Sequence, residues 1–175
     1  VLDSMSKRYS LCGARLGMLV SFNREIMAGV LCIAQGRLSA GFVDQAIASK
    51  LTDVPASYLA GVQAEYAKRR DVLYEGLRKI PGVTIPKPEG AFYTIVGLPV
   101  ADAEAFCQWL LTDFRHNNET VMLAPAAGFY GSTSLTTGAT PGKGKNEVRI
   151  AYVLNTTKLT RCIEILAKAL QMYHP

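Results

Sequence analysis

A long helical pattern over residues 56–80 constrains the fold of this 175-residue chain more than any other feature. Its apolar side chains recur every three to four positions, the spacing that gathers them on one face of an α-helix. Pro81-Gly82 ends the pattern, because proline cannot continue a helix and glycine readily adopts the left-handed conformation that follows one. We therefore predict a connecting helix over residues 56–80, with a different structural unit on each side.

The first 55 residues read as a mixture of strands, loops and helices. Val1-Leu2 is typical of the end of a buried strand, and the polar stretch Asp3 to Gly13 predicts a loop. The weakly alternating run from Leu16 to Phe22 predicts a second strand. Helical spacing then extends from Arg24 to about Ile33 and again from Phe42 to Leu51.

After Pro81-Gly82 the pattern becomes α+β, with helices packed on one face of a sheet. Strands are expected at Val83–Pro86, Ala91–Val96, Val121–Ala124 and Glu147–Leu154, and helices at Asp102–Phe114 and Thr157–Tyr173. Residues Ala126 to Asn146 form a long loop rich in glycine, serine and threonine. Loops of this length usually have a function or are mobile.

Composition and charge argue against several classes of protein. The net charge is +5 at pH 7, but lysine and arginine are scattered, so we expect no nucleic-acid surface. No run approaches the roughly 18 apolar residues of a transmembrane helix, so we expect no membrane partner. The four cysteines form no Cys-x-x-Cys pair and there are two histidines, so we expect no metal site. Unpaired cysteines fit a reducing compartment, and we expect a cytoplasmic protein.

Chemically informative residues gather near the start of the chain. Lys7 follows Ser4 and Ser6 in a stretch of small residues, directly after an expected strand end, where α/β folds place ligands. Arg15 begins an apolar strand, a position where a charge is costly without a partner. Hydroxyls, a guanidinium and backbone N–H groups together make a phosphate site, here beside a lysine. Taken alone, Lys7 also fits the description of an ordinary surface lysine.

The order Ser-x-Ser-Lys, with an arginine in Gly-x-Arg-x-Gly eight residues after the lysine, resembles the cofactor-lysine motif of a known family. The motif resembles that of the class I/II (fold type I) aminotransferases, which depend on pyridoxal 5'-phosphate (PLP). Within this class, the resemblance is to the aspartate aminotransferase family. The resemblance implies that Lys7 carries PLP as a Schiff base and serves as general base and acid. It further implies that Ser4 and Arg15 hold the cofactor phosphate and that Ser6 belongs to the same site.

Two later segments match the family in the same order. Pro88–Tyr93 resembles its P-x-G-x-F-Y segment, which implies that Phe92 lies near the substrate. Asn146–Tyr152 resembles its N-x-V-R strand, in which the arginine, here Arg149, binds the substrate α-carboxylate. A guanidinium fork pairs with a carboxylate in a bidentate manner that lysine cannot reproduce. By spacing alone Arg149 also fits a surface arginine on an edge strand.

Further likenesses concern the Pro125 region and the neighbouring subunit. Val121–Pro125 with Phe129 resembles the family's V-x-x-x-P-G-x-x-F region, although Ala126 replaces the usual glycine. Arg37 falls where members of the family place residues that approach the active site of the neighbouring subunit. The resemblance implies that Arg37 binds a side-chain carboxylate of the substrate. Ser39 would approach the partner's cofactor phosphate in a homodimer. A surface or helix-end role is the alternative for both Arg37 and Ser39.

The resemblance maps the chain onto the last two-fifths of a full enzyme. It implies residues 1–55 as the tail of an α/β large domain, 56–80 as a connecting helix and 81–175 as an α+β small domain. The chain also lacks an initiator methionine. We therefore expect a C-terminal fragment, inactive alone, of an enzyme that transfers amino groups between amino acids and 2-oxo acids, with aspartate and 2-oxoglutarate as the first expectation. Another fold type I PLP enzyme and a non-catalytic binding domain stay open.

Overall fold

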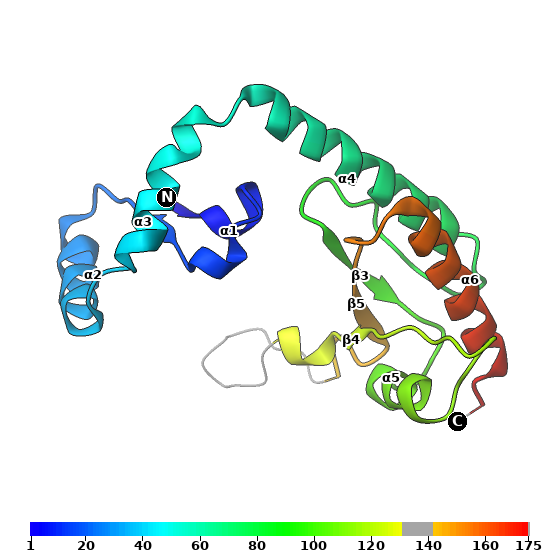
Figure 1. Ribbon diagram of the computed structural model, residues 1–175. Coiled ribbons are helices and arrows are strands. Elements are labelled where there is room, and N and C mark those ends of the chain that lie inside the picture. Colours follow the sequence, from blue (N-terminus) through cyan, green and yellow to red (C-terminus); the bar gives the residue numbers. More distant parts are fainter. Residues whose placement is uncertain (131–141, 175) are drawn as a thin grey trace. The chain divides into compact units, whose positions relative to one another are not determined.

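The computed structural model describes residues 1–130 and 142–174, and it divides into two compact units, Val1–Val62 and Gln63–Pro175 (Figure 1). The division lies inside helix α4 (Ala56–Leu77), earlier than the boundary expected at Pro81-Gly82. The reason is that Leu73 and Leu77, near the end of α4, are 2% and 0% exposed in the core of the second unit. The second half of the helix is therefore part of that unit.

The N-terminal unit begins with a small antiparallel hairpin. Its elements are β1 (Leu2–Ser4), α1 (Met5–Arg8), the 3-10 turn η1 (Cys12–Ala14), β2 (Gly17–Leu19), α2 (Arg24–Arg37), α3 (Phe42–Ser49) and the 3-10 turn η2 (Lys50–Asp53). The loop expected over residues 3–13 thus contains a helical turn, because the Ser4 hydroxyl accepts a hydrogen bond from the Ser6 N–H and caps α1. The strand expected over residues 16–22 is shorter, because the Asn23 side chain already caps α2.

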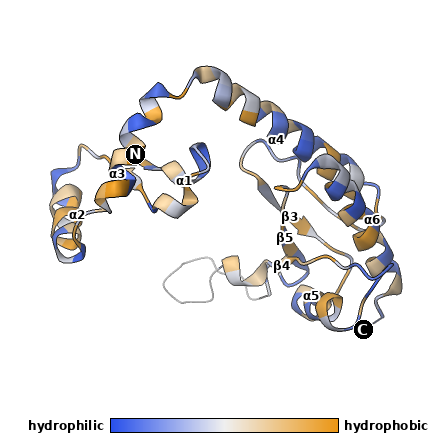
Figure 2. Cartoon of the chain, viewed as in Figure 1, coloured by the Kyte–Doolittle hydropathy of each residue, from blue (hydrophilic) through white to orange (hydrophobic). Residues whose placement is uncertain are grey.

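No residue of the N-terminal unit is buried, although the structure describes all of residues 1–62. A strand is present at this position, but Val1 and Leu2 are 84% and 83% exposed, so the prediction that it is buried is wrong. Figure 2 shows hydrophobic residues along α3, where Phe42 is 84% exposed. The 62 residues thus bury too little apolar surface to form a core of their own.

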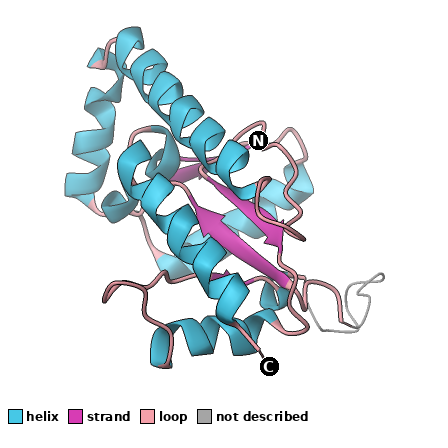
Figure 3. Cartoon of the chain, turned by 90° about the vertical axis from the view of Figure 1, so that its right-hand side faces the viewer, coloured by secondary structure: helices cyan, strands magenta, loops and turns pink. Residues whose placement is uncertain are grey.

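The C-terminal unit is a three-stranded antiparallel sheet with helices (Figure 3). Its elements after α4 are β3 (Tyr93–Gly97), α5 (Ala103–Thr112), β4 (Ala124–Pro125), the 3-10 turn η3 (Ala127–Phe129), β5 (Glu147–Ala151) and α6 (Thr156–Met172), in the strand order β3-β5-β4. The expected helices and the strands at β3 and β5 are confirmed. The strand expected at residues 83–86 is reduced to one bridge between Thr84 and Gly97, because Pro86 has no N–H for a ladder. Part of the expected long loop, residues 131–141, lies outside the described residues.

One face of the sheet forms the core with all three helices. Thr94, Val96, Val148 and Ile150 point to this face and are buried. They are joined by buried side chains of α4, α5 and α6, among them Leu77, Phe106, Leu110, Leu159 and Leu166. Helices α4 and α6 lie side by side (Figure 1), because Gly76 lacks a side chain where a Cβ atom would come within 2.6 Å of Ile163. The opposite face of the sheet carries alternate residues, including Tyr93 and Arg149.

Within the described residues, no helix has both the length and the apolar character needed to cross a membrane.

The Cys107 thiol makes the C-terminal unit sensitive to alkaline pH. Cys107 is buried on α5, and burial, assisted by the nearby Glu104 carboxylate, raises its pKa from 9.0 to about 11. Between these values the folded state binds more protons than the unfolded state, so the free energy of unfolding falls as pH rises from about 9 to about 11. Urea unfolding followed by Trp109 fluorescence at increasing pH measures the decline. Cys107→Ala should show a shallower decline, and an equal decline in both proteins would contradict the assignment.

Candidate functional site

Four of the predicted cofactor residues lie in the connection between β1 and β2. The two strands pair Ser4 with Gly17, and the Met5 N–H donates to the Leu16 carbonyl, which closes the connection at its base. The Ser4 hydroxyl caps α1, so Ser6 and Lys7 lie within the helical turn that follows it. Lys7 is exposed and Ser6 is half-buried.

Arg15 closes the same connection in the left-handed backbone conformation, with φ of 50°. This conformation costs free energy in a non-glycine residue and usually persists where surrounding contacts or function demand it. One guanidinium nitrogen of Arg15 donates to the Cys12 carbonyl at 3.0 Å. A guanidinium has five N–H donors, so most of them are left for an anion.

The structure places Arg37 close to the same region. Arg15 and Arg37 both line a cavity of about 400 Å³, together with Asp3 and residues of β2 and α2. Ser39 lines an adjacent cavity with Gly17, Ala40 and other residues. Arg37 and Ser39 are exposed, and their predicted roles toward a partner subunit stay predictions.

Arg149 lies on the central strand of the C-terminal sheet, so the edge-strand alternative is wrong. It pairs with Ile95 of β3 on one side and Ala124 of β4 on the other. Its neighbours in the chain, Val148 and Ile150, are 0% and 8% exposed on the core face. The guanidinium therefore projects from the opposite, open face, because successive side chains of a strand alternate between the two faces of the sheet.

Comparison with known proteins identifies the family to which the chain belongs. The family model described as "Aminotransferase class I and II" matches residues 1–166. The chain belongs to the class I and II aminotransferases.

Individual relatives agree with this assignment. The aspartate aminotransferase of Pyrococcus horikoshii is 25% identical over 174 residues, which cover 97% of this chain and 40% of the relative. The LL-diaminopimelate aminotransferase of Oleidesulfovibrio alaskensis is 30% identical over 170 residues, covering 94% and 38%. In fold, the chain resembles the α-aminoadipate aminotransferase of Thermus thermophilus, solved in complex with N-(5'-phosphopyridoxyl)-L-leucine, with a TM-score of 0.77 at 22% identity and coverage of 97% and 41%. The chain thus spans about 40% of the length of the curated relatives it matches.

The β1–β2 connection has the donor set that PLP, the cofactor of class I and II aminotransferases, requires. Lys7 supplies a primary amine for the cofactor aldehyde. The Arg15 guanidinium and the Ser6 hydroxyl supply hydrogen-bond donors for a phosphate. The Ser4 oxygen accepts from the Ser6 N–H, which leaves its O–H free to donate to the same phosphate. These residues therefore fit the group by their chemistry.

The aminotransferase segment around Phe92 is anchored by a buried tyrosine. The Tyr152 hydroxyl donates to the carbonyls of Gly90 and Ala91 at 3.2 and 3.1 Å, and the Tyr152 N–H donates to the Phe92 carbonyl. Burial raises the pKa of Tyr152, which keeps the donor protonated. Phe92 itself is half-buried, and its ring meets that of Tyr93 edge-on at 5.2 Å.

Replacing Tyr152 by phenylalanine is expected to lower the free energy of unfolding of the C-terminal unit by about 1 kcal/mol. The ring volume is kept, and the two carbonyls belong to exposed residues that water can reach, so only the hydrogen bonds are lost. Urea unfolding followed by Trp109 fluorescence measures the change. Tyr173→Phe, in which no described hydrogen bond is lost, is the matched control. Equal stability of Tyr152→Phe and the unchanged chain would show that the bonds contribute nothing.

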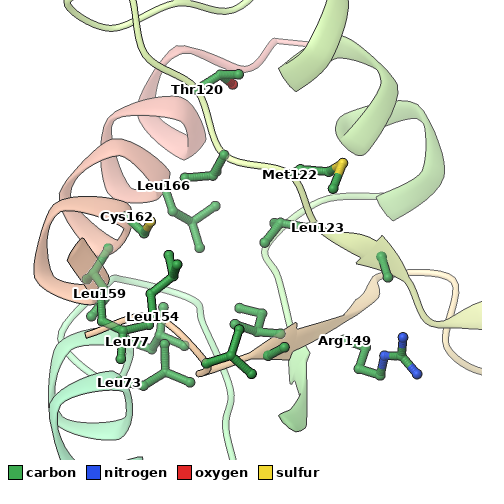
Figure 4. A pocket seen from close by; sticks show the side chains of 16 residues that line it. Leu73, Leu77, Thr120, Met122, Leu123, Arg149, Leu154, Leu159, Cys162 and Leu166 are labelled. Atoms are coloured by element: carbon green, nitrogen blue, oxygen red, sulfur yellow. The ribbon is translucent and has the colours of Figure 1, made fainter. Parts of the chain in front are cut away.

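A larger apolar cavity lies beside Arg149 but is not a carboxylate site. Its volume is about 630 Å³, and most of its lining is aliphatic side chains of α4, α6 and the 120–124 segment. Figure 4 shows Leu73, Leu159 and Leu166 directed into it, whereas the guanidinium of Arg149 points away. The Arg149 guanidinium is therefore presented on the other face of the sheet and not inside this cavity.

Two residues around Arg149 were not assigned roles from the sequence. Its guanidinium carbon lies 4.5 Å from the ring centre of Phe129 and 5.3 Å from that of Tyr93. Tyr93 is two residues before Ile95, the partner of Arg149, and the alternation of strand side chains places it on the same face. The place of Tyr93 beside Arg149 depends on the register of β3 and β5, and the contact with Phe129 depends on how η3 follows β4.

Proposed function

We propose that the whole protein is a PLP-dependent aminotransferase that moves an amino group from aspartate to 2-oxoglutarate. The proposal rests on the position of Arg149, which lies on the central strand of the sheet and projects from its open face. Within residues 1–130 and 142–174 it forms no ion pair and no hydrogen bond to a carboxylate. An arginine arranged in this way is suited to bind a carboxylate from outside the chain.

The residues of this chain divide the work of the reaction. Ser4, Ser6 and Arg15 hold the phosphate of the cofactor, and Lys7 binds its aldehyde carbon. PLP, when bound, supplies an electron sink for the pair left behind when the substrate Cα–H bond breaks. The amine of the substrate would replace Lys7 at that carbon, and the released Lys7 Nζ would then take the Cα proton as a general base and return a proton as a general acid. Arg149 would hold the α-carboxylate, and Phe92 would contact the substrate.

Support for the substrate pair comes from relatives and from charge. Relatives named aspartate aminotransferase cover nearly the whole chain, and the solved relative from T. thermophilus binds a phosphopyridoxyl amino acid. Arg37, which lines the same cavity as Arg15, is proposed to bind the side-chain carboxylate of aspartate. We further propose a cytoplasmic homodimer, supported by four free cysteines and by the exposed apolar surface of residues 1–62, in which Ser39 would approach the partner's phosphate.

Assays of amino-group transfer test the proposal. The whole protein with PLP is expected to convert aspartate and 2-oxoglutarate to oxaloacetate and glutamate. A coupled assay, in which the oxaloacetate formed is reduced, measures the rate. The 175 residues alone are expected to show no turnover, because they span about 40% of the length of their relatives. Turnover by the 175 residues would contradict that part, and release of carbon dioxide without transfer would favour another PLP enzyme.

Replacing Arg149 by lysine in the whole protein is expected to lower kcat/KM for aspartate by roughly 100-fold, equivalent to about 3 kcal/mol. Lysine keeps the charge but cannot donate two parallel hydrogen bonds to the carboxylate. Steady-state kinetics measure the loss, with Arg24→Lys, exposed at the start of α2, as the control. An unchanged kcat/KM would remove Arg149 from the substrate site.

A further inference from the structure

We infer that Phe129 and Tyr93 are positioning residues, which hold the guanidinium of Arg149 so that its N–H edge faces the carboxylate of the substrate. The inference rests on the proposed function and adds two residues to it. Both rings lie within cation–π distance of the guanidinium carbon, at 4.5 Å for Phe129 and 5.3 Å for Tyr93. A guanidinium stacked on a ring contacts it through its flat face, which leaves the in-plane N–H groups free to donate.

The sheet explains why these rings reach Arg149. In the register of β3 and β5, Arg149 lies opposite Ile95, so Tyr93 is its diagonal neighbour on the same face. Diagonal neighbours in an antiparallel pair are within reach of aromatic and long side chains. On the other side Arg149 lies opposite Ala124, whose methyl group leaves space above the sheet. Phe129 enters from η3, which begins two residues after β4 ends.

A carboxylate on the same strand as Arg149 is already engaged elsewhere. Glu147 lies two residues before Arg149, on the same face of β5. Its carboxylate accepts a hydrogen bond from the hydroxyl of Tyr130, the residue after Phe129. Among the described residues, Arg149 has ring partners and no carboxylate partner. The N–H groups that an ion pair with Glu147 would occupy are therefore left for a ligand.

Stacking matters because an unrestrained arginine has many rotamers. Binding a carboxylate immobilises the side chain, and that loss of freedom opposes binding. Two rings that order the guanidinium beforehand reduce this cost. Because each ring contact at an exposed position has a modest strength, removing one is expected to weaken carboxylate binding roughly two- to fivefold.

The test uses the 175-residue chain labelled with ¹⁵N at arginine. The Nε–Hε resonance of Arg149 is assigned by its loss in Arg149→Lys, and its heteronuclear NOE reports the order of the guanidinium. Phe129→Leu and Tyr93→Leu remove a ring, whereas Phe129→Tyr and Tyr93→Phe keep it. Both positions are about half exposed, at 56% and 42%, so folding is expected to survive and is checked by the amide spectrum of the core.

Succinate is the carboxylate probe, titrated into each protein while the Arg149 resonance is followed. The inference expects the leucine variants to lower the NOE and raise the Kd for succinate roughly two- to fivefold, and the ring-keeping variants to retain both values. It is overturned if the wild-type chain binds succinate and the leucine variants change neither quantity, or change the NOE alone. A wild-type Arg149 resonance that succinate does not move contradicts the carboxylate role in the proposed function, and overturns this inference with it.

Discussion

Replacing Lys7 by alanine is expected to abolish the specific covalent attachment of PLP to this chain. Borohydride reduction of a mixture with PLP fixes the cofactor to whichever amine holds its aldehyde carbon, and peptide mapping then locates the label. In the unchanged chain we expect the label on the peptide that contains Lys7, because Ser4, Ser6 and Arg15 are proposed to hold the cofactor phosphate beside that amine. Surface lysines lack a phosphate site and should react weakly and without preference.

Two controls make the labelling experiment decisive. Lys50→Ala removes an exposed lysine of the same unit, which is bridged to Asp53 at 3.9 Å, and should leave the label on Lys7 unchanged. Arg15→Ala keeps the amine and should weaken the labelling, because the phosphate loses its guanidinium. Label spread over many lysines of the unchanged chain would mean that residues 1–62 alone do not organise the cofactor site. The same dispersed result in the whole protein would refute the assignment of Lys7.

Replacing Phe106 by alanine is expected to lower the free energy of unfolding of the C-terminal unit by about 3–5 kcal/mol. Phe106 on α5 is fully buried, and its ring packs against Trp109 at 6.0 Å and edge-on against Tyr173 at 5.0 Å. The change removes the aromatic contacts and leaves a cavity that the surrounding helices and sheet can fill only in part. Urea unfolding followed by circular dichroism measures the loss, since Trp109 fluorescence would itself be altered.

Leu111→Ala is the matched control for this measurement. Leu111 lies on the same helix but is 45% exposed, so the expected change is within about 1 kcal/mol. Equal losses for Phe106→Ala and Leu111→Ala would show that the helix, and not the core beneath it, determines the stability. A small loss for Phe106→Ala with an unchanged m-value would contradict the tightly packed core of this unit.

Patterns of local origin were predictable from the sequence. The long helix, the helices α5 and α6, and the strands β3 and β5 follow from apolar periodicity and from the side chains that cap helix ends, such as Asn155 on α6. The family itself could be identified from short motifs, because Lys7, Arg15 and Arg149 lie at the spacings typical of the class I and II aminotransferases. The direction of the Arg149 side chain, away from the core, is the one that strand alternation gives to a residue between two buried neighbours.

Features that depend on contacts between distant segments required the structure. Nothing local indicates that β5 pairs on both sides, which makes Arg149 a central-strand residue, or that η3 brings Phe129 over its guanidinium. The helical pattern over residues 56–80 showed a helix but not that its second half belongs to the core, because that depends on α6 packing against Gly76. Conversely, Val1-Leu2 was expected to end a buried strand, whereas among the described residues nothing buries it, and Phe42 on α3 is likewise exposed. Periodicity reports which face of an element is apolar, whereas the surface that covers that face is set by tertiary packing.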